Sequence, residues 1–182
     1  MKILAFAGST SSTSINRELV KFVLKDFKDE EINLIDLNDF SMPVFSVDLE
    51  KKGFPDQAHQ FLKAIEDCDV IICSLAEHNR SYSAAFKNTF DWASRINVKV
   101  FQNKPMLLMS TSPGGYGGGN VMNTAKTFFP QFAADIRDTF SLPKFYENFD
   151  FESGVINPDM LNELKSKIAN FKNQVMNTKS QN

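Results

Sequence analysis

The sequence predicts an α/β fold built around a parallel β-sheet. Short, continuously apolar runs alternate along the chain with segments whose apolar residues recur at helical spacing. Continuous apolar strands are typical of a sheet that is covered by helices on both faces. In addition, two loops that follow such runs hold most of the glycines and a run of six hydroxyl residues, and open α/β sheets bind ligands at the carboxyl ends of their strands.

The first half of the chain supplies three of the expected strands. Residues 2–7 are apolar and end at a glycine, which predicts a buried strand. Helical spacing runs from Ile15 to Phe27, with Ser14 or Thr13 as the N-cap. The next expected elements are a strand over 32–37, an irregular stretch over 38–56, a helix over 58–65 and a strand over 70–76.

The second half continues the alternation. A polar loop over 77–83 precedes a helix marked by Phe86, Phe90 and Ala93. The remaining expected elements are a strand over 106–110, a loop over 111–120, a helix from about 121 to 134, a short strand over 138–142 and a helix over 161–175. We expect one domain over residues 1–176 and a frayed tail over 177–182.

Composition excludes several classes of protein. The 182 residues carry 20 Lys and Arg against 22 Asp and Glu, a net charge of −2, which argues against a nucleic-acid backbone binder. The two Cys are spaced C-x₄-C and the two His lie elsewhere, a spacing that does not fit the usual four-ligand Cys/His zinc site, so we expect no metal. No apolar run approaches the ~18 residues of a membrane span, and the apolar N-terminal run is short for a signal peptide. A cytoplasmic protein without a membrane partner is therefore expected.

The loop after the first strand is suited to a phosphate group. Residues 9–14 are all Ser or Thr and lead into a helix, whose N-terminus offers unpaired N–H groups and a partial positive charge. The loop lacks the P-loop pattern, so hydrolysis of a nucleoside triphosphate is not expected. The alternative is a serine-rich turn in which one side chain caps the helix.

The loop over 111–120 is rich in glycine. Its glycines fail the dinucleotide-binding spacing, because Asn120 stands where a third glycine would be needed. Such a loop can lie flat against a planar ring. The alternative is a mobile surface loop.

Three motifs occur in the order found in one flavoprotein family. They are Gly8-Ser9-x-Ser11-x-x-Ser14-x-Asn16-Arg17, Ala76-Glu77-His78-Asn79 followed by Phe86-Lys87-Asn88-Thr89-Phe90-Asp91-Trp92-Ala93-Ser94-Arg95, and Ser112-Pro113-Gly114-x-x-Gly117-Gly118. Over roughly residues 2–130 they resemble the NADPH-dependent FMN reductase family, which includes bacterial chromate and quinone reductases. The chain departs from the family pattern at three positions, with Ser11 in place of Arg, Ala76 in place of Pro and His78 in place of Tyr.

The resemblance implies a flavodoxin-like, doubly wound fold with five parallel strands in the order 2-1-3-4-5 and FMN at their carboxyl ends. It implies a phosphate site at Ser9, Ser11, Ser14 and Asn16 with the backbone near Ile15. It implies ring contacts from Glu77, His78 and Asn79, largely through backbone, and from Ser112, Pro113, Gly114 and Gly115 at the other edge.

The resemblance also implies an activity. A hydride would pass from NADPH or NADH to FMN, and then to a quinone, an azo compound, a metal oxyanion or free flavin, with no catalytic side chain. One alternative is an electron carrier of the flavodoxin type, and another is an interaction protein that has lost the flavin. His78 could carry positive charge near the reduced ring or pack as a neutral ring.

The family likeness further implies a homodimer or homotetramer with the flavin sites near the interface. Trp92 and Arg95 would lie in that interface. The alternative is a core Trp beside a solvated Arg. Cys68 and Cys73 flank or enter a buried strand and are expected to be inert.

Overall fold

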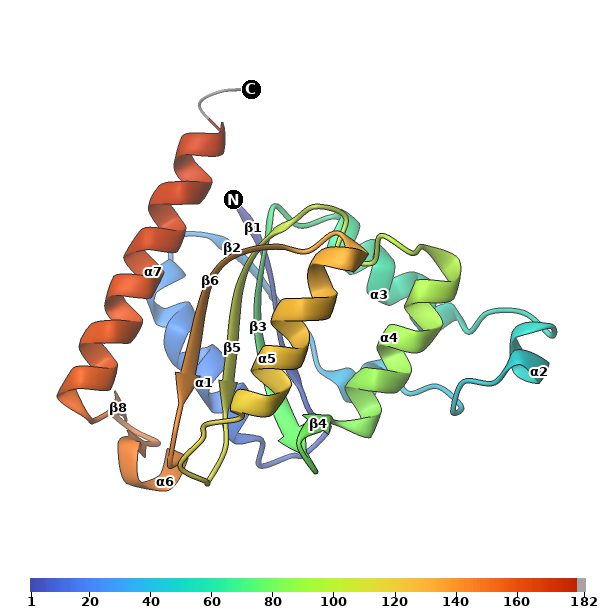
Figure 1. The fold of residues 1–182 in the computed structure, drawn as a ribbon. Coiled ribbons are helices and arrows are strands. Elements are labelled where there is room, and N and C mark those ends of the chain that lie inside the picture. The colour runs from blue at the N-terminus through green and yellow to red at the C-terminus, as the bar shows by residue number, and fades with distance from the viewer. Residues whose placement is uncertain (180–182) are drawn as a thin grey trace.

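A twisted sheet forms the centre of the computed structural model, which describes residues 1–179 and side chains up to residue 176. Its five parallel strands are ordered β2-β1-β3-β5-β6, and the short β4 pairs antiparallel with the end of β3 (Figure 1). Counted along the chain without β4, this is the order 2-1-3-4-5, so that prediction is confirmed. The strands are β1 (Lys2–Gly8), β2 (Glu31–Leu34), β3 (Val70–His78), β4 (Ser81–Tyr82), β5 (Pro105–Thr111) and β6 (Asp135–Leu142).

Helices cover both faces of the sheet, as the continuous apolar strands predicted (Figure 1). Along β1, Leu4 and Phe6 pack into the core under one set of helices, whereas Ile3 and Ala5 pack into the core on the opposite face. One face carries α1 (Ile15–Leu24) and α7 (Pro158–Lys179), and the other carries α3 (Asp56–Glu66), α4 (Ala84–Ile96) and α5 (Gly119–Phe128). None of the described helices is both long and apolar enough to cross a bilayer.

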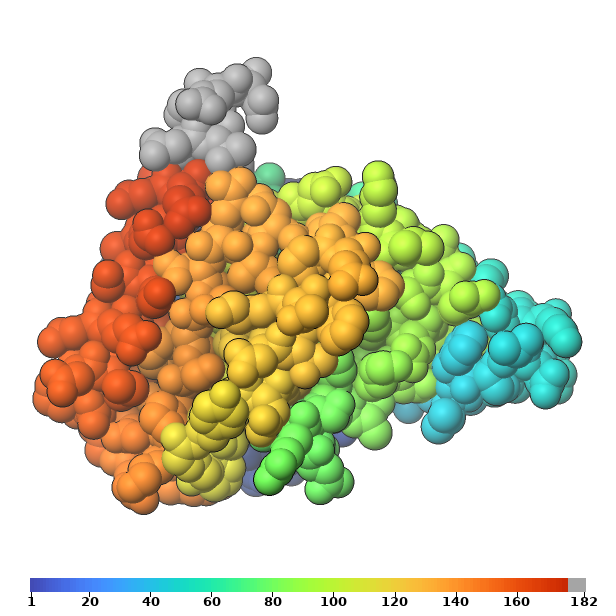
Figure 2. Space-filling model, viewed as in Figure 1, coloured from blue at the N-terminus to red at the C-terminus, as the bar shows by residue number. Residues whose placement is uncertain are grey.

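An arm over residues 41–55 stands out from the body of the molecule and carries the short α2 (Val47–Glu50) (Figure 2). Its base lies against α4, where Trp92 Nε1 donates a hydrogen bond to the Pro43 carbonyl at 2.8 Å. Trp92 is only 1% exposed, and Arg95 pairs with Glu50 on the arm at 2.9 Å. Trp92 is thus buried by its own chain. The expectation that it lies in a subunit interface is wrong, and the alternative of a core Trp holds.

Short elements complete the fold. They are η1 (Lys25–Phe27), η2 (Leu37–Phe40), η3 (Phe129–Phe132), α6 (Phe145–Asn148), β7 (Phe149–Asp150) and β8 (Gly154–Val155). Of these, η1 and η3 lie within stretches expected as helix, and the other four were not expected from the sequence. Each holds two to four residues, which is too few for a periodic pattern to register.

Several element boundaries differ from the sequence-based expectation. The helix expected to reach residue 134 ends at Phe128, since Pro130 cannot continue the hydrogen-bond ladder and Ala133 takes a left-handed φ of 61°. The strand expected over 32–37 ends at Leu34, because the Asp36 side chain caps η2. Helix α7 continues to Lys179 into the expected tail, and residues 180–182 lie outside the described part.

Candidate functional site

A cavity of about 320 Å³ lies at the carboxyl ends of β1, β3 and β5. Its wall comes from the three loops that the sequence singled out, together with one residue of α6. Nine of the twelve predicted cofactor-binding residues line it: Ser9, Ser11, Ser14, Ile15, Asn16, Glu77, His78, Ser112 and Pro113. The wall is completed by Thr13, Ala76, Thr111 and Tyr146.

The hydroxyl loop is organised around the N-terminus of α1. Ser14 is the N-cap, and its Oγ accepts a hydrogen bond from the Arg17 amide at 3.2 Å. Ser11 Oγ accepts from the Thr13 amide at 3.3 Å, which folds the loop back on itself. The amides of Ile15 and Asn16 belong to the first turn, where the helix offers no preceding carbonyl. The loop therefore places backbone N–H groups and hydroxyl residues in the wall of one cavity, which suits a bound phosphate.

No Lys or Arg among the described residues lines this cavity. The nearest cation in sequence, Arg17, forms an ion pair with Asp36 instead. Burial raises the pKa of Asp36, but hydrogen bonds from Asn38 and Arg17 outweigh that effect and leave the pKa below its ordinary value. Asn38 in turn donates to the Thr10 carbonyl at 3.1 Å. The Arg17–Asp36 ion pair, with Asn38, thus supports the hydroxyl loop from outside the cavity. An anion in the cavity would be bound by uncharged hydrogen-bond donors and by the dipole of α1.

Asn16 is buried and its side chain holds the site together rather than facing a ligand. Its Oδ1 accepts from Ser74 Oγ at 2.7 Å and from the Thr111 amide at 3.0 Å, while its Nδ2 donates to the Thr111 carbonyl at 3.2 Å. These bonds join the first turn of α1 to β3 and β5. Only the backbone amide of Asn16 is left to meet a phosphate.

Glu77 connects the second loop to the third. Its carboxylate accepts from the Val121 amide at 2.9 Å and from Asn120 Nδ2 at 3.1 Å. These groups belong to the start of α5, whose N-cap Gly118 has no side chain to satisfy them. Glu77 therefore caps a neighbouring helix, and its backbone is the part that can face a cofactor ring.

Three predicted residues do not line the cavity. Asn79 sits at the tip of the β3–β4 hairpin, where it and Arg80 take φ values of 50° and 65°, as in a type I′ turn. A Cβ at Gly114 would make only an ordinary contact, 3.8 Å from Ser112 Oγ, and a Cβ at Gly115 would meet nothing within 4 Å. Gly117, in contrast, combines a φ of 59° with Leu142 and Pro143 backbone 2.9 Å from the place of a Cβ, so only glycine fits there.

Tyr146 is the lining residue that sequence reasoning missed most completely. It follows β6, outside the three loops, and the motifs of the resemblance end before it. Thr13, Ala76 and Thr111 were within reach, because they adjoin predicted site residues. The two cysteines behave as expected of inert thiols: both are buried, and burial raises the pKa of Cys68 to about 11 and that of Cys73 well above its usual range.

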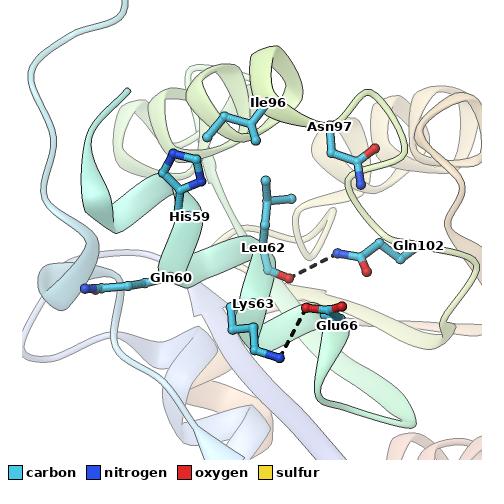
Figure 3. Close-up of a pocket in the computed structure, with 8 residues that line it drawn as sticks. All are labelled: His59, Gln60, Leu62, Lys63, Glu66, Ile96, Asn97 and Gln102. Atoms are coloured by element: carbon cyan, nitrogen blue, oxygen red, sulfur yellow. Dashed lines mark hydrogen bonds and ion pairs between the residues drawn. The ribbon is translucent and has the colours of Figure 1, made fainter. Parts of the chain in front are cut away.

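A second, larger cavity of about 700 Å³ lies between the C-terminal parts of α3 and α4 (Figure 3). His59, Leu62, Lys63 and Ile96 are among the residues that line this α3–α4 groove. Lys63 is paired with Glu66 at 3.2 Å, and Gln102 Nε2 donates to the Leu62 carbonyl at 3.1 Å. Lys63, Glu66 and Gln102 are thus already paired within the chain.

Comparison with known proteins points to one family. The family model described as NADPH-dependent FMN reductase matches residues 1–147. Among curated relatives, an NADPH:quinone oxidoreductase from Arabidopsis thaliana is 34% identical, over 65% of this chain and 61% of the relative. An NAD(P)H-dependent FMN reductase from Pseudomonas aeruginosa is 31% identical, over 64% of this chain and 63% of the relative. The alignments thus span about three fifths of these relatives.

Solved structures share the whole fold. FerB, a flavoenzyme NAD(P)H:(acceptor) oxidoreductase from Paracoccus denitrificans, superposes with a TM-score of 0.76 at 23% identity and covers 97% of both chains. Identity at this level supports the fold alone. The flavodoxin-like architecture is therefore supported along the chain, including the region after residue 147.

Proposed function

The chain belongs to the NADPH-dependent FMN reductase family, and from this premise we propose that its cavity binds FMN for NAD(P)H-dependent reduction of a small acceptor. When bound, FMN supplies the redox chemistry: it accepts a hydride from NADPH or NADH and passes two electrons and a proton on to the acceptor. The acceptor is a quinone, an azo compound, a metal oxyanion or free flavin. A cytoplasmic location accords with the use of NAD(P)H.

The N-terminus of α1 is the observation that carries this proposal. The amides of its first turn adjoin four hydroxyl residues of the cavity wall, Ser9, Ser11, Thr13 and Ser14, and the one carboxylate among the described lining residues, that of Glu77, is bonded to α5; this setting fits a phosphate monoester. The proposed phosphate site comprises Ser9, Ser11, Ser14, the Ile15 backbone and the Asn16 amide. We assign the ring to Glu77 and His78, through backbone, and to Ser112 and Pro113. Asn79, Gly114 and Gly115 support these loops from outside the cavity.

The chain positions the cofactor and provides no side-chain acid or base. Glu77 and His78 are the only titratable acidic or imidazole side chains that line the cavity in the described structure, and the carboxylate of Glu77 is occupied by α5. Backbone N–H groups at the ring can stabilise developing negative charge without a proton transfer from the protein.

A homodimer or homotetramer with flavin sites near the interface is part of the proposal. The arm leaves Val44 82% exposed and Val47 58% exposed, although it is anchored to α4 by Trp92. A projecting segment with exposed apolar side chains suits contact with a second copy. Light scattering on the purified protein tests this, and a monomer at all concentrations would contradict it.

A flavin spectrum followed by anaerobic titration with NADPH tests the function. Purified protein reconstituted with FMN should show the visible flavin bands, and one equivalent of NADPH should bleach them. Bound FMN that NADPH leaves oxidised, but that a partner reductase bleaches, would indicate an electron carrier. Protein that stays colourless after soaking with FMN would contradict the cofactor assignment.

A further inference from the structure

Tyr146 lines the cavity although it belongs to none of the three loops. It lies in α6, directly after β6, and 64% of the residue is exposed. Single exposed aromatic residues are ordinary on protein surfaces, so the exposure by itself says little. The position is informative, because no other described residue in the cavity wall carries a benzene-type ring.

The backbone that carries Tyr146 is fixed to the third loop. The Lys144 amide donates to the Gly114 carbonyl at 2.9 Å, and the Phe145 amide donates to the Ser112 carbonyl at 3.1 Å. Phe145 is fully buried and stacks on Phe149, with ring centroids 4.6 Å apart. Tyr146 is therefore mounted on a rigid base, and holding its ring at the cavity costs little additional ordering entropy.

Tyr146 makes few contacts through its ring and hydroxyl within the described part of the chain. The ring meets Phe145 edge to face at 5.5 Å, and no described residue forms a hydrogen bond with its hydroxyl. Tyr116 on the third loop differs, since it is 60% exposed but its hydroxyl accepts from Asn123 Nδ2 at 3.1 Å, and it does not line the cavity. Tyr146 alone of these two combines a free aromatic surface with access to the site.

Cavity size favours a ligand other than the flavin as the partner of this ring. A volume of about 320 Å³ is near the lower end for ligand pockets, so the flavin mononucleotide proposed above would occupy most of it. Tyr146 lines this cavity and is largely exposed, so we expect a substrate that enters from solvent to meet its ring. Offset stacking of two planar rings then adds binding free energy beyond simple burial.

We propose that Tyr146 is a binding residue for aromatic electron acceptors, whose planar ring it stacks against at the mouth of the flavin site. The inference rests on the proposed function and specifies the acceptor class within it. Quinones with fused or substituted rings gain from this contact. An inorganic acceptor such as ferricyanide has no planar ring and gains nothing.

Acceptor kinetics of the FMN-loaded protein test the proposal, with 1,4-naphthoquinone compared with ferricyanide at saturating NADPH. Tyr146→Leu should raise the KM for naphthoquinone about fivefold, with kcat, the ferricyanide reaction and the Kd for FMN unchanged. Tyr146→Phe keeps the ring and should stay within about twofold of wild type. Tyr116→Leu, which removes an exposed tyrosine outside the cavity, is the matched control and should behave as wild type.

A binding measurement separates failure of this inference from failure of the proposed function. Naphthoquinone titrated into the oxidised, FMN-loaded protein and followed by the flavin absorbance bands reports binding without turnover. Weaker naphthoquinone binding in Tyr146→Leu supports the inference about Tyr146, whether or not the wild-type protein oxidises NADPH. A wild-type protein that oxidises no NADPH would contradict only the proposed reductase function. Equal binding in the two proteins, slowing of both acceptors alike, or loss of FMN affinity would each overturn it.

Discussion

Two cavities of this molecule, the α3–α4 groove and the cavity at the carboxyl edge of the sheet, show that cavity size and binding chemistry are separate properties. The α3–α4 groove, at about 700 Å³, is more than twice as large as the cavity at the carboxyl edge, at about 320 Å³. In the groove, Lys63 and Gln102 are already paired with other groups of the chain. In the smaller cavity, the amides of Ile15 and Asn16 in the first turn of α1 have no preceding carbonyl within the helix. Hydrogen-bond donors that the fold has not paired mark a binding site better than volume does.

The largest expected difference between the two cavities is the effect of an added negative charge on FMN affinity. Ser14→Asp keeps an N-cap of similar quality but places a carboxylate against the phosphate, so FMN affinity should fall about 1000-fold or more with little loss of fold. Fluorescence titration of FMN measures the affinity. Gln60→Glu adds the same charge in the groove and should leave FMN affinity unchanged. Equal affinity in Ser14→Asp and wild type would rule out the phosphate assignment.

Removal of side-chain hydrogen bonds should lower the free energy of unfolding more at the smaller cavity than at the groove. Asn16→Ala removes three hydrogen bonds that join α1 to β3 and β5, so the free energy of unfolding should fall by about 3 kcal/mol. Gln102→Ala removes one bond at the groove and should cost no more than about 1 kcal/mol. Urea denaturation measures both. Similar losses in the two variants would show that Asn16 has no special structural part.

Neutralising one carboxylate in each cavity should give a smaller difference in stability. Glu77→Gln retains an acceptor for the Val121 amide but loses the charge at the N-terminus of α5, so stability should fall by about 1 kcal/mol. Glu66→Gln weakens an exposed pair with Lys63 at the groove and should change stability by less than about 0.5 kcal/mol. Thermal unfolding measures both. A larger loss of stability in Glu66→Gln than in Glu77→Gln would contradict a capping role of Glu77.

The smallest expected effect is a pH dependence of stability that arises from the Arg17–Asp36 ion pair beside the hydroxyl loop. The pKa of Asp36 is lowered from its ordinary value of 3.8, so the unfolded chain binds this proton more readily than the folded chain. The stabilisation is fully present above pH 3.8 and is lost as pH falls through the lower, folded pKa. Asp36→Asn should therefore flatten the decline in stability below about pH 4. An identical pH profile for the two proteins would contradict a role for the pair with Arg17.

Much of the molecule was predictable from the sequence because its signals are local. Alternating apolar strands and amphipathic helices predicted a parallel sheet with both faces covered, and the family motifs supplied the strand order. The motifs also named nine residues of the cavity wall, since each loop directly follows a strand and the strands end at one edge. Boundaries failed where a single residue decided them, as at Pro130 and Asp36.

The sequence by itself determined the layers of this protein and the loops that meet at its carboxyl edge. Only the tertiary structure decided which groups in those loops stay free. It turned the Asn16 side chain and the Glu77 carboxylate toward the protein, buried Trp92 under the arm and brought Tyr146 to the cavity. The physical reason is that a polar group serves a ligand only if the fold has not already paired it, and pairing depends on neighbours far away in the chain.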